Sequence, residues 1–425
     1  MELKVSVNDV TQCDVAVIGG GTAGCFAAIA AANAGAATVL IEKNGMLGGT
    51  MTAGGVNFPG LFFAWGKQII GGPCWAAIER TMALAGAEMP AVRYAPANHW
   101  DEQILINRFI YTAVLDEFCA EAGVAIRLHT MLSHAEETED GVTLFVTGKS
   151  GLQCVQAKVL IDATGDANAV TLLGYACAES AVLQPASLVH TLAGYDIHAI
   201  DKAALTAAVG QAVAEGRLPQ DINAEYVHDG LARHKIRFHV PCAEAFSSAG
   251  KTQVELAARK KLCDILAVLQ TMPGLGGIYA DYAAAECGIR ETKRIVGEKT
   301  MTEANYLAGT VYDDAIAYAF YPVDRHVMGG IVQTFLEPET VPTVPYGALI
   351  PKGAKRVLAA GRCAAADANT NSAVRVQAPC MAMGQAAGCA AALAAAGDMP
   401  VAAVDYTALC AALAAQGAIV PGQGK

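Results

Sequence analysis

Charged residues are scarce in this sequence of 425 residues. Asp, Glu, Lys and Arg together make up 16%, whereas hydrophobic residues make up 54%. An average globular protein contains roughly 25% charged residues. A chain of this composition can bury a large interior, which excludes an intrinsically disordered protein. Its length allows two or three domains.

Basic residues are also outnumbered. The chain has 29 Lys and Arg against 40 Asp and Glu, which gives a formal net charge of -11. Nucleic acids and anionic membrane surfaces require a basic field, so neither is an expected partner. A local basic pocket for a small anion is compatible with this charge.

Cysteine occurs 13 times but without the spacing of a metal site or a redox pair. There is no Cys-x-x-Cys pair and no His/Cys cluster at zinc spacing, and the odd count fits reduced thiols. We therefore expect no bound metal and a cytoplasmic location. Cys74 and Cys380 are expected to be buried small hydrophobes rather than reactive thiols.

Long uninterrupted hydrophobic runs are absent. The two charge-free stretches, Val15–Ile41 and Val376–Gly397, are interrupted by Gly, Asn, Thr or Gln, and the second contains Pro379. We therefore expect buried α/β structure in both and no membrane span. Residues 1–10 lack an apolar segment before their acidic residues, so no signal peptide is expected.

Residues 14–42 have the pattern of a strand, a helix and a second strand. Val15–Ile18 is apolar, Thr22–Asn33 is rich in alanine, and Thr38–Ile41 is an apolar run with β-branched residues. Gly35 is expected to end the helix. This unit predicts an α/β fold with a parallel sheet.

The turn between the first strand and the helix carries the motif Gly19-x-Gly21-x-x-Gly24. Such glycines permit a tight turn, a close approach of the backbone to a pyrophosphate, and close packing of helix on strand. The phosphate then binds at the helix N-terminus. Glu42 follows the second strand, where a carboxylate can bind a ribose hydroxyl and disfavours the 2′-phosphate of NADP. The unit therefore predicts a dinucleotide site.

The stretch from Asp14 to Gly49 resembles the FAD signature of glutathione-reductase-type flavoproteins, in which an E-K-x-x-x-x-G-G element follows the second strand. VLIDATGD at Val159–Asp166 is similar to the A-T-G element that follows the β-meander of that family. VLAAGR at Val357–Arg362 is similar to its strand ending in glycine, followed by a loop and the helix MAMGQAAGCAAALAAAG. In that family the N-terminus of this helix points at the flavin pyrimidine and stabilises negative charge on the reduced ring.

The resemblance implies FAD as the cofactor. Because Gly49 stands where covalent members carry the flavin-linking histidine, FAD is expected to be noncovalent. Carried over residue by residue, the resemblance assigns cofactor contacts to Gly19, Gly21, Thr22, Ala23, Gly24, Glu42, Lys43, Gly48, Gly49, Thr50, Leu132, Ala163, Thr164, Gly165, Gly361, Arg362, Pro379 and Met381.

If these segments share one sheet, the FAD domain is discontinuous. Strand-like runs in Val124–Asp162 alternate with turns, as in an antiparallel meander. The predicted fold class is α/β, with a Rossmann-like FAD-binding domain that has a parallel sheet and a β-meander, plus an inserted α+β substrate domain. The expected boundaries are 1–58, 109–178 and 345–425 for the FAD domain, and 59–108 and 179–344 for the substrate domain.

Three further segments, GIRETKRIVGEKTMT, VPTVPYGALIPK and ADANTNSAVRVQAPCMAMGQAAG, resemble a broad bacterial family of FAD-dependent oxidoreductases related to fumarate reductase and succinate dehydrogenase flavoproteins. The likeness spans nearly the whole chain. Arg290 looks like the arginine that the fumarate reductases use as proton donor. His326 in PVDRHVMGG and Arg375 in SAVRVQAPCM are similar to the histidine and arginine that act on the substrate carboxylate. The resemblance therefore implies three catalytic residues.

The chain departs from this pattern before Arg375. Asn369, Asn371 and Ser372 stand where related proteins usually have a histidine, and none of them supplies a charge. Substrate recognition is therefore expected to differ.

Each of the three basic residues has a second interpretation. Arg290 is expected on a helix, where neighbouring acids could make it a surface ion-pair residue. His326 could be a loop histidine with satisfied hydrogen bonds, and Arg375 could contact the flavin or a carbonyl. His99 and His190 could face the cavity, but a lone histidine is more often structural.

The expected function is that of an FAD-dependent oxidoreductase, a dehydrogenase or reductase. It would transfer a hydride between flavin N5 and a small polar substrate that bears a carboxylate or carbonyl. Arg375 and His326 would orient this substrate, and Arg290 or His326 would move the proton. An arginine pKa above about 12 favours His326 as the acid, whereas the resemblance favours Arg290.

Two alternatives remain open. One is an FAD-dependent oxidase or dehydrogenase of an alcohol, amine or sugar, in which the basic residues serve the flavin. The other is a flavin-binding electron carrier or subunit without its own turnover. No ferredoxin-like cysteine run is present, so an external electron donor or acceptor is expected as a partner. The sequence does not indicate an oligomeric state.

Overall fold

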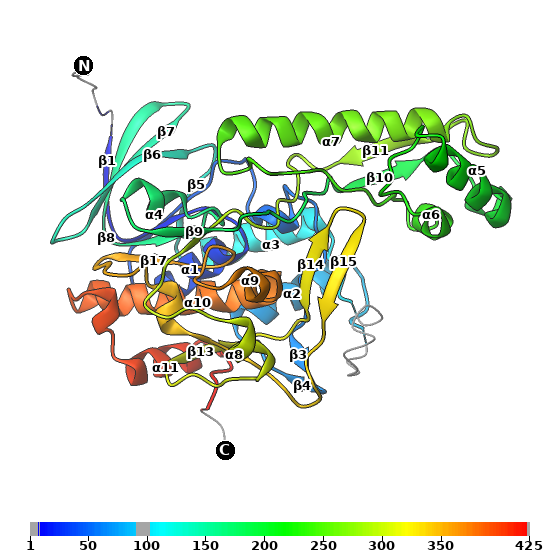
Figure 1. The fold of residues 1–425 in the computed structure, drawn as a ribbon. Helices are drawn as coiled ribbons and strands as arrows, with labels where there is room; N and C mark the ends of the chain where they lie inside the picture. The colour runs from blue at the N-terminus through cyan, green and yellow to red at the C-terminus, as the bar shows by residue number, and fades with distance from the viewer. Residues whose placement is uncertain (1–6, 8, 91–102, 423–425) are drawn as a thin grey trace.

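A mixed sheet, parallel on one side and antiparallel on the other, lies at the left of the molecule in the view of Figure 1. The computed structural model describes residue 7, residues 9–90 and residues 103–422, so His99 lies outside the described residues. The strand order is β5-β2-β1-β8-β7-β6, and β17 also pairs with β8. The strands are β1 (Val10–Ile18), β2 (Thr38–Ile41), β5 (Ala125–Arg127), β6 (Met131–Glu137), β7 (Val142–Gly148), β8 (Gly151–Asp162) and β17 (Val357–Ala359).

Strand β8 joins the parallel part of this sheet to an antiparallel part. It pairs parallel to β1 from Cys154 to Asp162 and parallel to β17 at its end. It also pairs antiparallel to β7, which in turn pairs antiparallel to β6. The predicted α/β fold with a parallel sheet and a β-meander is therefore confirmed.

Helix α1 (Thr22–Asn33) has the predicted bounds, and helix α10 (Gln377–Ala396) packs along it. A Cβ added at Gly384 would lie 2.0 Å from the Ala23 carbonyl oxygen, and one at Gly388 would lie 2.2 Å from the Ala27 oxygen. Both glycines are therefore required, because any side chain would push the helices apart.

Two predictions for the segment before α10 were wrong. The helix begins at Gln377, four residues before the predicted start, because Pro379 is tolerated in a first turn. The expected loop contains another helix, α9 (Ala368–Val374), which begins where the side chain of Asp367 accepts a hydrogen bond from Thr370 N. Among the described helices, α10 has the length and hydropathy of a membrane span, but it is mostly buried in the protein, as a core helix is.

A second hydrophobic core lies beside the first and contains residues between Leu183 and Ile289. The long helix α7 and helices α5 and α6 extend away from the main sheet there (Figure 1). The elements of this region are β10 (His190–Ala193), η3 (Ile197–Ala199), α5 (Lys202–Ala214), α6 (Ala224–Leu231), α7 (Ser248–Leu269) and β11 (Tyr279–Ala283).

The remaining elements contribute mainly to the first core or lie over it. This distribution of core residues does not test the expected domain boundaries, which stay a prediction. These elements are η1 (Gly49–Met51), β3 (Phe63–Ala64), β4 (Lys67–Gln68), α2 (Pro73–Leu84), α3 (Arg108–Glu121), α4 (Asn168–Leu172), β9 (Cys177–Glu179), β12 (Lys293–Ile295), α8 (Glu303–Leu307), β13 (Ala315–Tyr318), β14 (Val323–Val327), β15 (Gly330–Thr334), β16 (Thr343–Pro345), η4 (Tyr346–Leu349), η5 (Val401–Ala403) and α11 (Tyr406–Ala415).

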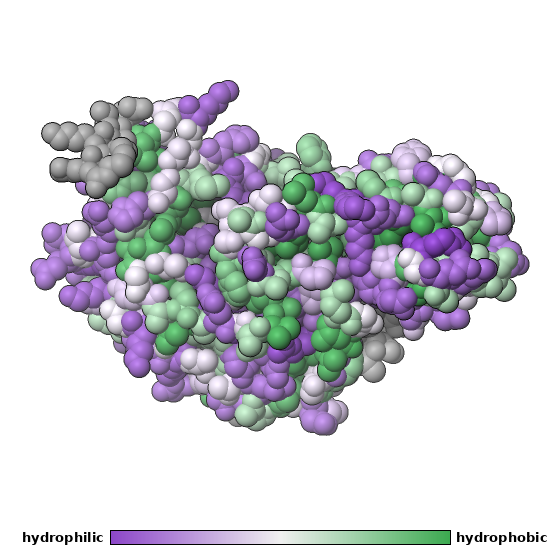
Figure 2. Space-filling view, turned by 45° about the horizontal axis from the view of Figure 1, so that its top comes forward, coloured by the Kyte–Doolittle hydropathy of each residue, from purple (hydrophilic) through white to green (hydrophobic). Residues whose placement is uncertain are grey.

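The surface mixes polar and apolar residues. Figure 2 shows hydrophilic and hydrophobic residues interspersed over the visible face. All thirteen cysteines are unpaired, and Cys74 and Cys380 are both buried. Burial raises the pKa of the Cys380 thiol to about 12, so this thiol stays protonated and behaves as a small hydrophobe.

Candidate active site

The fold requires two of the three glycines in the motif after β1, and it does not require the third. Gly19 has a φ of +98°, and a Cβ there would lie 2.6 Å from the Ala163 oxygen. A Cβ at Gly24 would lie 1.7 Å from the Gly19 oxygen. A Cβ at Gly21 would meet only Gly49 Cα, at an ordinary 3.8 Å. Gly21 thus leaves open space beside the helix N-terminus, as a phosphate cradle requires.

The first turn of α1 is suited to an anion. Its N-cap residue is Gly21, which gives no side-chain hydrogen bond to the exposed N–H groups of the turn. Thr22 Oγ1 lies 2.5 Å from Gln377 Oε1, so the N-terminus of α1 meets the N-terminus of α10. Two helix N-termini, each with positive partial charge, therefore converge at one place.

Glu42 ties the glycine loop to the end of β2. Its two carboxylate oxygens accept hydrogen bonds from Gly20 N at 2.7 Å and Asn44 N at 2.8 Å. Burial raises the pKa of this carboxyl. A carboxylate has about four lone-pair sites, so it can accept further bonds from a ribose. Leu132 lies in β6, two residues after Thr130, whose N donates to Glu42 O at 3.0 Å.

The segment after β2 closes over the glycine loop. Gly48 N donates to Gly20 O at 2.8 Å. Gly49 has a φ of +53°, and a Cβ there would lie 2.8 Å from Gly21 Cα. A histidine at position 49 would therefore collide with the loop. Thr50 follows in η1, whereas Lys43 forms an ion pair with Glu286.

The A-T-G turn lies directly beside the glycine loop. Ala163 N donates to Ile18 O at 2.8 Å, and the carboxylate of Asp162 accepts from Thr164 N and Oγ1. Gly165 has a φ of +74°. Asp162, the last residue of β8, is buried. Its carboxylate thus holds the turn in shape.

Arg362 is engaged by protein groups. Its Nε donates to Gly165 O at 2.8 Å, and its Nη2 lies 2.5 Å from Asp166 Oδ1. Lys251 on α7 binds the other oxygen of Asp166 at 2.8 Å. Although burial raises it, these two cations hold the pKa of Asp166 well below its usual range. Asp166 thus joins Arg362 to α7.

The start of α10 completes this region. A Cβ at Gly361 would lie 2.8 Å from Ala23 Cβ, so the turn after β17 touches α1. Pro379 and Met381 lie in the first turns of α10, and Met381 is fully buried. The structure therefore brings the glycine loop, Gly48 and Gly49, the A-T-G turn and Gly361 around two helix N-termini, with open space at Gly21 and acceptor capacity at Glu42. These features fit an FAD.

Arg375 lies between α9 and α10, two residues before the start of α10. Its Nη2 donates to Gln184 Oε1 at 3.4 Å and to Asp324 O at 3.3 Å. Burial lowers its pKa, while the carboxylate of Asp324 opposes that shift. The guanidinium is thus held by protein acceptors on one side.

The expectation that Arg290 lies on a helix was wrong. It lies in an irregular segment between β11 and β12, where Gly288 pairs with Ser187 instead of continuing a helix. Its Nη1 donates to Pro185 O and its Nη2 donates to Ser187 Oγ at 3.1 Å. Burial and the neighbouring charge of Arg375 lower the pKa of Arg290 to about 9.

His326 lies on strand β14 rather than in a loop. Its Nε2 lies 3.3 Å from Asp324 Oδ2, and its Nδ1 lies 3.3 Å from His239 Nε2. Burial lowers the pKa of His326 to about 4 despite the contact with Asp324. Both ring nitrogens are therefore already engaged by protein groups, and the imidazole is neutral at pH 7.

Two buried donors in this cluster have no hydrogen-bond partner among the described residues. They are Arg375 Nε and Gln184 Nε2. Gln184 is 1% exposed, and its Oε1 already accepts from His326 N at 3.0 Å and from Arg375. These two acceptances fix the orientation of the amide. An oxygen acceptor is the group that would satisfy both remaining donors.

Sequence analysis missed Gln184, Asp324 and His239. Asp324 lies two residues before His326 on one face of β14, so the strand period could have found it. Gln184 and His239 carry no local pattern and reach the cluster only through the tertiary fold.

The polar residues before Arg375 hydrogen-bond to other protein groups. Asn369 Oδ1 accepts from Arg325, Asn371 Nδ2 donates to Arg362 O, and Ser372 Oγ accepts from Asp324 N. His190 is likewise satisfied, with Nδ1 beside Leu188 O and Nε2 accepting from Ile236 N. Among these side chains, Asn371 Oδ1 is buried without a hydrogen-bond partner in the described residues.

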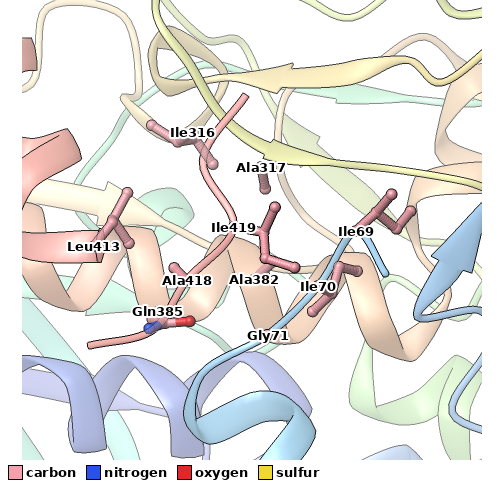
Figure 3. Close-up of a pocket in the computed structure, with 10 residues that line it drawn as sticks. All are labelled: Ile69, Ile70, Gly71, Ile316, Ala317, Ala382, Gln385, Leu413, Ala418 and Ile419. Carbon is pink, nitrogen blue, oxygen red and sulfur yellow. The ribbon is translucent and has the colours of Figure 1, made fainter. Parts of the chain in front are cut away.

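A separate small pocket lies beside the middle of α10 and the C-terminal segment (Figure 3). Its lining is aliphatic apart from Gln385, and it includes no residue assigned to the cofactor or to catalysis. It offers no acid, base or nucleophile for chemistry. The lining residues are Ile69, Ile70, Gly71, Ile316, Ala317, Ala382, Gln385, Leu413, Ala418 and Ile419.

Solved structures with a partial likeness to this chain have low sequence identity to it. A geranylgeranyl bacteriochlorophyll reductase-like protein from Thermoplasma acidophilum is 13% identical, with a TM-score of 0.45, over 96% of this chain and 83% of that chain. p-Nitrophenol 4-monooxygenase PnpA from Pseudomonas putida DLL-E4 is 13% identical, with a TM-score of 0.44, over 95% of this chain and 84% of that chain.

Other likenesses cover less of the molecule. OxyS anhydrotetracycline hydroxylase from Streptomyces rimosus is 18% identical, with a TM-score of 0.32, over 44% of this chain and 38% of that chain. At these values the structures carry no argument about substrate. None of the curated proteins matches the sequence.

The family comparison also covers nearly the whole sequence. A family model described as FAD dependent oxidoreductase matches residues 14–413. This range includes the glycine loop, the A-T-G turn, the start of α10 and the whole basic cluster. The chain therefore belongs to the FAD-dependent oxidoreductase family, and the protein is an enzyme whose cofactor is FAD.

Proposed function

We propose that this enzyme transfers a hydride between FAD and a carbon of a small substrate that bears a carboxylate or carbonyl oxygen. The site would be related to that of the fumarate reductases. When bound, FAD supplies the hydride donor or acceptor at its N5 position. The residues of the chain would bind and orient the substrate and supply or remove its proton.

The main support is the pair of buried donors without partners. Arg375 Nε and Gln184 Nε2 each lack an acceptor among the described residues, although both groups are deeply buried. An unsatisfied buried donor costs about 1–3 kcal/mol, so the free protein gains by binding an oxygen there. Arg375 and Arg290 add positive charge, which favours a carboxylate over a neutral carbonyl.

Arg375 would hold the substrate through the side of its guanidinium that the protein leaves free. Its other side is anchored by Gln184 Oε1 and Asp324 O. Because Arg375 directly precedes the N-terminus of α10, a carboxylate bound to it lies close to the place assigned to the flavin ring by the family resemblance. The arrangement would fix the reacting carbon next to the ring.

Arg290 is the better candidate for the proton donor. Its lowered pKa, about 9, makes it a stronger acid than an ordinary arginine, and proton transfer is more efficient when the pKa approaches the working pH. His326 is a weaker candidate, because it is neutral at pH 7 and both of its ring nitrogens contact protein groups. Its role would be to hold Asp324.

Substitution of the arginines tests this proposal. Arg375→Lys and Arg290→Lys should each slow substrate-dependent reduction or reoxidation of bound FAD by about 100-fold or more, because lysine keeps the charge but loses the planar fork. The rates are measured without oxygen on protein with stoichiometric FAD, with 2-hydroxy acids, amino acids and 2-enoic acids as substrates.

Arg325→Lys is the matched control. Arg325 lies next to His326 on β14 but hydrogen-bonds to Asn369. The Arg325→Lys variant should react at the rate of the parent. If all three variants react like the parent, the proposed substrate site is wrong.

The panel also separates the alternatives. Reduction of FAD by neutral alcohols, amines or sugars, with no loss in the arginine variants, would favour an oxidase or dehydrogenase of such substrates. Failure of every substrate would favour a flavin-binding electron carrier. In each case we propose an external electron donor or acceptor for the other half-reaction, and the unpaired cysteines support a reducing, cytoplasmic location.

A further inference from the structure

His239 is held in place by an unusual set of backbone contacts. It lies in the segment between α6 and α7. Its N–H donates to Asp221 Oδ2 at 2.7 Å, and its carbonyl oxygen accepts from Lys261 Nζ at 2.8 Å. Asp221 and Lys261 also form a salt bridge at 2.8 Å, with side chains that are 6% and 20% exposed. A buried ion pair is thus used to clamp the backbone of one residue.

The clamp directs the imidazole of His239 toward His326. His239 Nε2 lies 3.3 Å from His326 Nδ1, and the two rings meet nearly edge to face with an interplanar angle of 71°. His239 belongs to a segment of the second core, since Phe238 and Val240 are part of it, whereas Val323 of β14 is part of the first core. The contact therefore joins the two cores at the active-site cluster.

The contacts of His326 with Asp324 and His239 together determine which nitrogen of His326 carries the proton. Asp324 is ionised, because hydrogen bonding to His326 and the charge of Arg375 hold its pKa down against the effect of burial. An ionised carboxylate only accepts, so His326 Nε2 must carry the proton that faces it. His326 Nδ1 then has a lone pair, and His239 must donate to it from Nε2.

We propose that His239 is a positioning residue of the active site, whose Nε2–H donates to His326 Nδ1 and fixes the tautomer that holds Asp324 beside Arg375. This inference rests on the proposed function, because Arg375 is the group that would hold the substrate. His239 would act through His326 and Asp324, and it would not touch the substrate. Without its N–H, the ring of His326 can turn or change tautomer, and Asp324 loses one of its partners.

Burial and neighbouring cations favour the neutral form of both imidazoles, although Asp221 and Asp324 oppose this effect. Burial lowers the pKa of His239, and the charge of Arg290 lowers it further. A neutral His239 carries a single ring proton, so the direction of the hydrogen bond is defined. The charged groups that face the pair are Arg290, Asp221, Lys261 and Arg237 around His239, and Asp324, Arg290 and Arg375 around His326.

Two substitutions of His239 distinguish donation from packing. In His239→Gln the side-chain amide keeps an N–H donor at a similar reach, whereas His239→Leu keeps bulk and removes the donor. Nitrogen-15 NMR of histidine-labelled full-length protein, assigned with a His326→Gln variant, reports which ring nitrogen of His326 has the lone pair. This readout requires neither substrate nor turnover.

The parent and His239→Gln should show the lone pair on His326 Nδ1, and His239→Leu should lose that signature. Substrate-dependent flavin reduction should fall about 10-fold in His239→Leu and recover in His239→Gln, as expected when a reacting group is misplaced. His198→Leu, which removes an exposed histidine on η3, is the control and should change neither signal nor rate.

The outcomes separate this inference from the proposed function. An unchanged His326 tautomer in His239→Leu overturns the inference, whatever the arginine variants do. A changed tautomer, together with Arg290→Lys and Arg375→Lys variants that react like the parent, supports the hydrogen bond and overturns the proposed substrate site. Equal loss of rate in His239→Leu and His239→Gln with an unchanged tautomer reduces His239 to a packing residue and also overturns the inference.

Discussion

The nucleotide region and the basic cluster are built in different ways. The first consists of backbone turns in which short sequence motifs place glycines, a helix N-terminus and one carboxylate within a few residues of each other. The second consists of side chains from segments far apart in the sequence, such as Gln184, Arg290 and Arg375. A region made from local backbone can be recognised from its motif, whereas a cluster of remote side chains depends on the whole fold.

The largest effect should come from the glycines that the fold itself requires. Gly24→Ala would place a Cβ 1.7 Å from the Gly19 oxygen, so we expect a loss of stability of more than about 4 kcal/mol or no folded protein. Gly21→Ala meets nothing closer than 3.8 Å and should fold with the stability of the parent. Its FAD affinity should nevertheless fall by about 100-fold, because the Cβ takes the space of the pyrophosphate.

Thermal unfolding of the FAD-free proteins and flavin titration measure the two effects separately. If Gly21→Ala binds FAD like the parent, the phosphate lies elsewhere. If Gly24→Ala folds normally, the packing of α1 on the glycine loop is looser than described.

The next effect concerns the basic cluster and pH. The folded-state pKa of His326, about 4, is below the ordinary value of 6.5, so the unfolded chain binds the proton more tightly. The contribution of this residue to stability is complete above pH 6.5 and is lost as the pH falls toward 4. The loss should reach roughly 3 kcal/mol.

Urea unfolding of the parent and of His326→Gln between pH 7 and pH 4 checks this prediction, because the carboxylates other than Asp324, which contacts His326, titrate in both proteins and cancel in the difference. The parent should lose more stability than the variant over this range. Parallel curves would mean that the pKa of His326 is the same in the folded and the unfolded protein.

A smaller effect is expected at Glu42. Glu42→Ala removes the acceptor of Gly20 N and Asn44 N, and FAD affinity should fall by roughly 1.5–3 kcal/mol. Glu42→Gln keeps one acceptor oxygen and should lose less. Equilibrium titration measures both, and the absorbance of bound flavin should not change, because the ribose lies far from the ring. Equal affinity in the parent, Glu42→Ala and Glu42→Gln would mean that the ribose does not bind at the end of β2.

The smallest effect is expected at Lys43. Lys43 forms an ion pair with Glu286, and the two side chains are 42% and 37% exposed. Surface pairs contribute about 0–1 kcal/mol, so Lys43→Ala should change stability by less than about 1 kcal/mol and leave FAD affinity unchanged. A tenfold loss of FAD affinity would instead support the cofactor contact that the resemblance assigns to Lys43.

Most of the nucleotide region could be predicted from sequence, because its elements follow from local patterns. The alanine-rich run gives α1 its bounds, the apolar run Thr38–Ile41 gives β2, and the glycine turns separate the strands of the meander. The start of α10 was missed because a proline in the first turn reads as an interruption, although a helix tolerates it there.

The basic cluster could be predicted only in part. The charges around Arg290 alternate as on a helix surface. Its side chain, however, donates hydrogen bonds to Pro185 and Ser187, more than a hundred residues earlier. His239 and Gln184 are ordinary polar residues in sequence. They become part of the cluster only when the segments of the second core fold against the strand that carries His326.

The contact between the start of α1 and the start of α10 also bears on how the protein is made. Thr22 and Gln377 are separated by 355 positions, and a ribosome adds about 5–20 residues per second. The glycine loop therefore waits roughly 20–70 s for its partner helix after it is synthesised. During that time the face of α1 that Gly384 and Gly388 later contact is uncovered. It is an apolar surface that a chaperone can bind. FAD can be captured fully only near the end of translation, so chains that stop before α10 would be flavin-free and targets for degradation.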